Sequence, residues 1–362
     1  MKKHSTLKKF FALAAAAAMA LSLFACSGGG AGASADPSDD AQAGASQPHG
    51  GGQMPETQQP SGGETYKVAI IKLTDHPSLD EIAGAVAARL DEIAAENGVT
   101  IEYTVTSGQG DQTVLRQLSD QAIADGVDVI IPVATPAAQM AALSAEATRT
   151  PVIFSAVSYP ADVGLDGIDY VSGISDALNT ELILDMMLAQ NPNVSKVGLL
   201  YSLSEVNSAT PIAEAKAYLN GKGIAYVEQT ANSNDEVIAA AAALAAAGVD
   251  AVFTPTDNII ASAELAIAPN LIEAGIPHYA GADSFVRNGA FATCGVNYTQ
   301  LGRDSADLAY QAVTQGMGGM EDYYLAGGGI ITVNTETAAA LDLDYSMFSS
   351  MGAVVEVVTT ED

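Results

Sequence analysis

The sequence contains an internal repeat, in which the same order of strand-like and helix-like segments occurs twice. In the first half, the apolar strand-like segments lie at residues 67–71, 98–103 and 126–131. The second half repeats this order, with strand-like segments at residues 196–200, 223–227 and 248–253. Strands this apolar, alternating with helices, are typical of a parallel sheet that is covered on both faces. The repeat therefore predicts an α/β chain with two doubly wound, Rossmann-like lobes.

The repeat also predicts the domain boundaries. We expect lobe 1 at residues 66–175 and lobe 2 at residues 176–297, with residues of about 298–345 completing lobe 1 and a C-terminal tail at residues 346–362. The chain would then cross between the lobes three times and form a multi-strand hinge. Ligands of parallel sheets bind beyond the carboxyl ends of the strands, and a cleft between two hinged lobes can close around a small molecule. The sequence therefore predicts a ligand site between the lobes.

The N-terminal segment is predicted to be an export signal. Residues 1–26 combine a lysine-rich start with an apolar stretch too short to span a bilayer comfortably. They end in Leu23-Phe24-Ala25-Cys26, which resembles the bacterial lipobox and implies that a lipid is attached to Cys26. An ordinary signal cleaved at a small residue is the alternative. Residues 27–65 contain almost no large apolar side chain, so we expect a disordered tether.

Composition and motifs exclude several functions. The formal net charge of −29 is incompatible with a surface that neutralises nucleic-acid phosphates. Two cysteines cannot form a disulfide framework or a thiolate zinc site, and no histidine has a second one at metal-ligand spacing. Nucleophile-elbow, phosphate-loop and dinucleotide-binding motifs are missing from the sequence. We therefore predict no metal, no cofactor and no enzyme activity.

Polar residues recur directly after the predicted strands, at the same end of each. The candidate ligand-binding residues are His76, Gln109, Asp111, Thr135, Pro136, Ser155, Ala156, Tyr201, Asn207, Ser208, Thr256, Asp257, Asn258 and Asp283. Within this set, Asp257 and Asp283 are suited to an ammonium group, Thr135 and Ser155 to a carboxylate, and Tyr201 with Pro136 to an apolar wall. Each polar residue could instead be a helix cap or a turn residue. Ser78 and Glu81, for example, have the spacing of a capping box.

At these residues the sequence resembles a known family, the substrate-binding lipoproteins of ABC importers with the type 1 periplasmic-binding fold. It is most similar to the subfamily associated with tryptophan and other aromatic amino acids. The stretches that carry the resemblance are residues 68–80, 108–112, 134–139, 152–157, 196–208, 255–258, 289–290 and 301–303. The chain departs from the family pattern at Tyr159-Pro160, at residues 281–285 and in the tail.

The resemblance implies a two-lobed clamshell receptor on the outer face of the cytoplasmic membrane, held there by its lipid. Its implied partners are a small zwitterion, an aromatic amino acid such as tryptophan, and a membrane permease with a separate ATPase; a monomer would suffice. Three alternatives stay open at this point. The clamshell would serve a sensor kinase or chemoreceptor, it would bind another ligand such as a nucleoside or a branched amino acid, or the cleft acids would catalyse a reaction.

Overall fold

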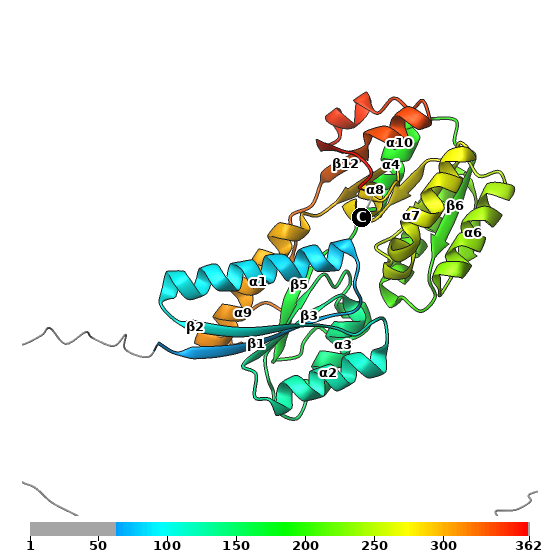
Figure 1. Ribbon diagram of the computed structural model, residues 1–362. Helices are drawn as coiled ribbons and strands as arrows, with labels where there is room; N and C mark the ends of the chain where they lie inside the picture. Colours follow the sequence, from blue (N-terminus) through cyan, green and yellow to red (C-terminus); the bar gives the residue numbers. More distant parts are fainter. Residues whose placement is uncertain (1–62, 361–362) are drawn as a thin grey trace, which may run out of the picture. The chain divides into compact units, whose positions relative to one another are not determined.

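The computed structural model describes residues 63–360 (Figure 1). The predicted signal peptide, the lipidation site Cys26 and all but the end of the predicted tether lie outside the described residues. Among the residues that the structure describes, no helix is long and apolar enough to cross a membrane.

The first lobe is built on a six-stranded sheet in the order β11-β5-β4-β3-β1-β2, and all its neighbouring strands are parallel. Its strands are β1 (Thr65–Lys72), β2 (Thr100–Ser107), β3 (Val129–Val133), β4 (Val152–Ser155), β5 (Val171–Ser175) and β11 (Tyr324–Leu325). Strands β3, β4 and β5 are buried along their whole length, as expected for a sheet that helices cover on both faces.

The second lobe is built on a seven-stranded sheet in the order β13-β12-β10-β9-β8-β6-β7. Its strands are β6 (Lys196–Tyr201), β7 (Ala225–Thr230), β8 (Ala251–Thr254), β9 (His278–Ala280), β10 (Ala292–Gly295), β12 (Ile330–Asn334) and β13 (Ala353–Val357). Only the β10–β12 pair is antiparallel among the described pairs. The order β7-β6-β8-β9-β10 matches β2-β1-β3-β4-β5 in the first sheet, so the structure confirms the predicted repeat and fold class.

Helices cover both sheets. The first lobe has α1 (Pro77–Asn97), α2 (Gln112–Ala124), α3 (Thr135–Ala145), η1 (Ala161–Val163) and α9 (Tyr298–Gln315). The second lobe has α4 (Thr180–Gln190), η2 (Val206–Ser208), α5 (Ala209–Lys222), α6 (Asn234–Ala246), α7 (Asn258–Glu273), α8 (Asp283–Arg287), α10 (Thr335–Ala340) and η3 (Ser346–Ser350).

Helices α1 and α9 pack against each other although they are far apart in the sequence (Figure 1). The apolar stripe predicted for α1 is buried, with Ile82, Val86 and Leu90 at most 1% exposed. Gly302 allows the close approach, because a Cβ atom at this position would lie 2.5 Å from the carbonyl oxygen of Ile82. This contact fixes α9 in the first lobe, so the chain returns there after its excursion through the second lobe.

The chain crosses between the sheets at residues 176–179, 296–297 and 326–329. The structure corrects the prediction that residues of about 298–345 complete lobe 1. Helix α9 and strand β11 do join the first lobe, but β12 pairs with β10 in the second sheet. The described part of the predicted tail also belongs to lobe 2: β13 pairs with β12, and Phe348 is fully buried against Phe291. The apolar side chains Ile331 of β12 and Phe348 of the tail are buried in the core of lobe 2. This burial stabilises both segments against the second sheet.

Candidate functional site

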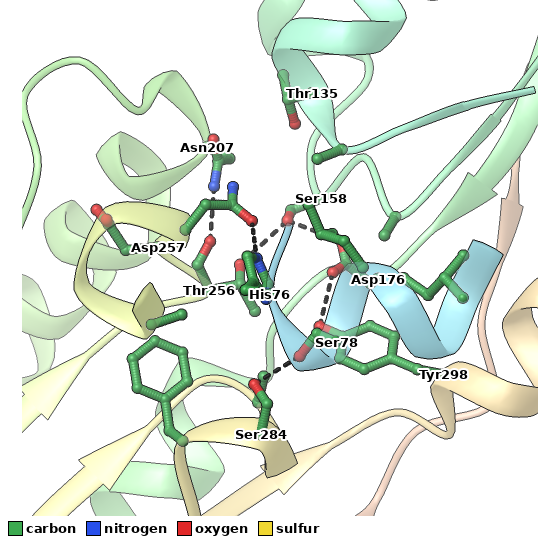
Figure 2. Close-up of a pocket in the computed structure, with 18 residues that line it drawn as sticks. His76, Ser78, Thr135, Ser158, Asp176, Asn207, Thr256, Asp257, Ser284 and Tyr298 are labelled. Atoms are coloured by element: carbon green, nitrogen blue, oxygen red, sulfur yellow. Dashed lines mark hydrogen bonds between the residues drawn. The ribbon is translucent and has the colours of Figure 1, made fainter. Parts of the chain in front are cut away.

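A pocket lies between the lobes, at the carboxyl ends of the strands (Figure 2). The residues that line it from the first lobe and its crossings are His76, Ser78, Leu79, Ile82, Ala134, Thr135, Ala156, Ser158, Asp176 and Tyr298. Those from the second lobe are Asn207, Thr256, Asp257, Asn258, Ala261, Ala282, Ser284 and Phe285. Each wall is thus built from loops that follow strands, as the switch-point rule for α/β sheets requires.

Three side-chain hydrogen bonds bridge the pocket. His76 Nε2 lies 2.9 Å from Asn258 Oδ1, Ser78 Oγ donates to Ser284 Oγ at 2.5 Å, and the hydroxyls of Ser158 and Thr256 are 3.3 Å apart. The free volume inside is about 30 Å³, which is space for roughly two water molecules. An amino acid can therefore enter only if the lobes move apart, and the three crossings are where such a hinge motion would act.

The role of Ser78 differs from the prediction. Helix α1 begins at Pro77, its N-cap is His76, and no side chain caps it. Ser78 instead bonds the opposite lobe, and Glu81 accepts a hydrogen bond from Thr299 of α9 at 2.6 Å. Because the helix already begins at Pro77, Ser78 is its second residue and not the N-cap that a capping box requires. The capping-box prediction was therefore wrong.

Asp257 is the best-satisfied acid of the pocket. Its Oδ1 accepts from the N–H groups of Ile259 and Ile260, both at 3.1 Å, and so caps helix α7. Its Oδ2 accepts from Ser202 N and Ser208 Oγ, both at 2.7 Å. Burial raises the pKa of Asp257, and these four hydrogen bonds oppose that rise. The side chain has little capacity left for a ligand, so it holds the second-lobe wall together.

Behind this wall lies Glu205, which is buried and orients Asn258. Asn258 Nδ2 donates to Glu205 Oε2 at 2.8 Å, which turns Asn258 Oδ1 toward His76 across the pocket. Burial and the neighbouring Asp257 raise the pKa of Glu205 to about 8. Burial lowers the pKa of His76, so its imidazole is held neutral at pH 7.

Asp176 follows β5 directly and lies at the first crossing between the lobes. Its Oδ1 accepts from Ser158 Oγ at 2.8 Å, and its Oδ2 accepts from the Tyr298 hydroxyl at 3.2 Å. The side chain is almost completely buried, and burial raises its pKa. Among residues 63–360, no lysine or arginine lines the pocket. Asp176 is therefore a buried acid with only two neutral donors, and a ligand cation would compensate it.

The first-lobe wall contains strained backbone. Ala134 has φ 79° and ψ 158°, and Ala156 has φ 56°. Positive φ values are unfavourable for alanine, and the region of Ala134 is populated almost only by glycine. Both residues line the pocket, where such strain is commonly found.

The structure brings seven of the fourteen predicted ligand residues to the pocket: His76, Thr135, Ala156, Asn207, Thr256, Asp257 and Asn258. Two others support it from behind, since Ser155 is buried beside Ala156 and Ser208 bonds Asp257.

The other five predicted residues lie outside the pocket lining. Gln109 bonds Asp75, and Asp111 caps α2. Pro136 lines a separate, outer hollow together with Glu205. The Tyr201 hydroxyl donates to Glu228, and Asp283 pairs with Arg287 on α8. Apart from Pro136, each of these residues has a partner on its own lobe that holds the side chain.

The sequence reasoning did not identify Asp176, Tyr298, Ser284 or Phe285. Asp176 and Tyr298 lie at crossings, which were predicted as hinge and not as binding residues. Ser284 and Phe285 stand next to Asp283, so the loop was identified but the wrong side chain was chosen. A signal for Asp176 was available, because an acid that directly follows a buried strand is a candidate for this edge of the sheet.

The fold and the pocket together define a class: a two-lobed protein with the type 1 periplasmic-binding fold and a pocket between its lobes. The family described as ABC transporter substrate binding protein matches residues 67–345. The chain belongs to this family. It is thus an extracytoplasmic substrate-binding protein, a solute receptor and not an enzyme, as predicted.

Relatives agree with this assignment. A tyrosine-binding protein of Clostridioides difficile is 28% identical over 306 residues, which cover 83% of this chain and 88% of that protein. A Streptococcus pneumoniae ABC domain in complex with L-Trp is 26% identical, with TM-score 0.72, over 81% of this chain and 100% of that chain. The ligand-free, open structure of a substrate-binding protein with adhesive properties from Clostridium difficile, also 26% identical, gives TM-score 0.62 over 82% and 100%. The lower score for the open structure agrees with the direct bridges between the lobes seen here.

Proposed function

We propose that the protein is the lipid-anchored receptor of an ABC importer and binds an aromatic amino acid in the interlobe pocket. The observation that carries the ligand class is the pocket itself: one buried carboxyl at the hinge, facing apolar and aromatic side chains. The tyrosine and L-Trp named for two relatives support the same class. Lobe closure would present both lobes to a membrane permease that a separate ATPase drives.

The ammonium group of the ligand would pair with Asp176. A buried carboxyl without a cationic partner is costly, and an ammonium group supplies both charge and hydrogen bonds. Ser158 and Tyr298 already hold the carboxyl in place, so its position is fixed before the ligand arrives. Because Asp176 lies in a crossing, binding there would also join the two lobes.

The carboxylate of the ligand would lie at the start of α3. This helix begins at Thr135, and its N-cap Ala134 has no side chain that can accept from the first-turn N–H groups. Such groups, together with the helix dipole, favour an anion. The Thr135 side chain is buried in the pocket wall, and the nearby buried Ser155 hydroxyl has no hydrogen-bond partner in the part of the chain that the structure describes.

The ring would pack on the apolar part of the lining, which Leu79, Ile82 and Phe285 provide. These side chains are at most 3% exposed, so a ring that replaces water against them gains from desolvation. The lipid anchor at Cys26 rests on the lipobox-like Leu23-Phe24-Ala25-Cys26, and globomycin-sensitive labelling with radioactive palmitate would test it.

The ligand test is calorimetric titration with the twenty amino acids, after unfolding and refolding to remove carried-over ligand. We expect binding of tryptophan or tyrosine. Asp176→Asn should weaken it by about 2 kcal/mol or more, roughly thirtyfold in Kd, because the ammonium loses its counter-charge. The control is Asp169→Asn, which changes an exposed aspartate at the other end of β5. Equal affinities of the two variants would contradict the role of Asp176, and binding of only non-aromatic ligands would contradict the ligand class.

A further inference from the structure

Two buried hydrogen-bond acceptors in the pocket wall have no partner among the described residues. They are Oδ1 of Asn207 and Nδ1 of His76. Asn207 is 5% exposed and His76 is 7% exposed, so water reaches neither freely. The two side chains come from opposite lobes and line the same pocket (Figure 2). A buried acceptor that stays unpaired costs free energy. A ligand that fills this space and donates a hydrogen bond to these acceptors should therefore bind more tightly than one that does not.

The chemistry of Asn207 is fixed by its neighbour. Its Nδ2 donates to the carbonyl oxygen of Thr256 at 2.7 Å. A carbonyl oxygen can only accept, so the amide cannot be turned the other way without losing this bond. Oδ1 is therefore the free end of the amide, and it offers lone pairs and no hydrogen.

The chemistry of His76 follows from a chain of contacts. Asn258 donates from Nδ2 to Glu205 and so turns Oδ1 toward His76 Nε2, at 2.9 Å. In this orientation of the amide, Nε2 carries the hydrogen and donates to Oδ1 of Asn258. The ring is neutral because burial lowers its pKa, so Nδ1 has a lone pair and no hydrogen. His76 thus presents a second acceptor.

The ammonium group of an amino acid would not use these acceptors first. Asp176 is a buried carboxyl of the same pocket and attracts a cation more strongly than a neutral amide oxygen or imidazole nitrogen does. In Figure 2, Asn207 lies on one side of His76 and Asp176 with Tyr298 on the other. An amino acid anchored at Asp176 would therefore direct another part, its side chain, toward Asn207 and His76.

We propose that Asn207 and His76 select aromatic amino acids whose ring carries a hydrogen-bond donor, the indole N–H of tryptophan or the phenolic O–H of tyrosine, over phenylalanine. The inference rests on the proposed function and narrows its ligand class. The phenyl ring of phenylalanine has no hydrogen-bond donor, so Asn207 Oδ1 and His76 Nδ1 would stay unpaired next to its carbon atoms. Sites built to pair a donor reject analogues that lack it, because the polar groups of the site are left unpaired.

The test compares ligands that differ only in the donor. In 3-benzothienyl-L-alanine a sulfur atom replaces the indole N–H of tryptophan with little change in shape, and phenylalanine is tyrosine without its hydroxyl. By calorimetric titration of the refolded protein, we expect each analogue to bind about tenfold to a hundredfold more weakly than its parent. Parent and analogue affinities within twofold of each other in both pairs would overturn the inference but leave the proposed function standing. Failure of all four to bind would overturn both.

Variants of Asn207 and His76 test whether these two residues cause the preference for ligands with a donor. Asn207→Leu and His76→Leu remove the acceptors, and in at least one of them the ratio between parent and analogue should fall toward one. Asn220→Leu, an exposed change on α5, is the control and should leave the ratio as in the wild type. An unchanged ratio in both leucine variants, with thermal unfolding showing that they are folded, would overturn the assignment to these residues. If a leucine variant does not fold, the ligand pairs on the wild-type protein decide the question.

Discussion

Helices α3 and α7 occupy equivalent places in the two halves of the repeat, yet they begin in opposite ways. Each follows the third strand of its half and begins at the pocket. The N-cap of helix α7 is Asp257, whose side chain caps the helix and accepts four hydrogen bonds. The N-cap of helix α3 is Ala134, which has no capping side chain and a strained backbone. The start of α7 is thus capped by a carboxylate of the chain itself, and the start of α3 is not.

This difference assigns different tasks to the two walls of the pocket. The second-lobe wall is tied together by hydrogen bonds, in which Asp257 accepts from Ser202 and Ser208 and Asn258 donates to Glu205. The first-lobe wall has no capping side chain at the start of α3, where we propose that the ligand carboxylate binds. The comparison explains why Asp257, which the sequence suggests as an ammonium partner, is better understood as a structural cap. It also predicts that damage to the second-lobe wall reduces stability and damage to the first-lobe wall reduces affinity.

The largest effect should come from Asp257→Ala. This change leaves buried donors on Ser202 and Ser208 unpaired and uncaps α7, so we expect the free energy of unfolding to fall by about 3–5 kcal/mol. Urea unfolding measures it. The matched change is Asp111→Ala, which removes an N-cap of the same kind from α2 but at an exposed site, and should cost only about 1 kcal/mol. Similar losses in the two variants would show that the buried network adds nothing to capping.

The next effect is a pH dependence from Glu205. Its pKa of about 8 lies above the ordinary value of 4.5, so the folded protein binds a proton that the unfolded chain has released. Stability from this group is present at low pH and is lost as the pH rises through 8. Between pH 7 and 8 we expect the free energy of unfolding to fall by about 1 kcal/mol.

Between pH 7 and 8, the change in stability should come mainly from Glu205 and not from His76. The pKa of His76 is lowered from 6.5, so His76 releases its last protons from the unfolded chain just above pH 7 and contributes only a small slope of the opposite sign. Glu205→Gln should reduce the fall, and any slope that remains should come from the other buried acids, such as Asp176, whose pKa is also raised. A wild-type protein whose stability rises between pH 7 and 8 would contradict the assignment.

Much of the fold follows from the sequence, because a repeated order of buried strands and amphipathic helices permits few arrangements. The segment after residue 326 was harder to predict. Strand β12 is apolar enough for either sheet, and only its antiparallel pairing with β10 shows that it belongs to lobe 2. Long-range pairing of this kind leaves no local pattern in the sequence.

The site was predictable by region but not by side chain. The candidates were chosen because they follow strand ends, and half of the predicted set lines the pocket. The sequence could not show which residues already have partners. Tyr201 and Asp283 were chosen for their chemistry, but Glu228 and Arg287 occupy them. Asp176 was missed because it stands out as a candidate only through its burial between the two lobes, which the sequence does not show.

The smallest expected effect tests the strain at the first-lobe wall. Ala134→Gly removes one methyl group and relieves a backbone conformation that costs alanine about 1–3 kcal/mol. Part of this gain is offset by the greater freedom of glycine in the unfolded chain, so we expect a net stabilisation of about 1 kcal/mol by urea unfolding. Affinity for the amino acid should fall a few-fold, since the start of α3 becomes less rigid. The control, Ala239→Gly at an exposed position inside α6, should instead destabilise by about 1 kcal/mol and leave affinity unchanged. If Ala134→Gly destabilised the protein as much as Ala239→Gly, the first-lobe wall would store no strain, and the contrast between the two helix starts would reduce to the presence or absence of a capping side chain.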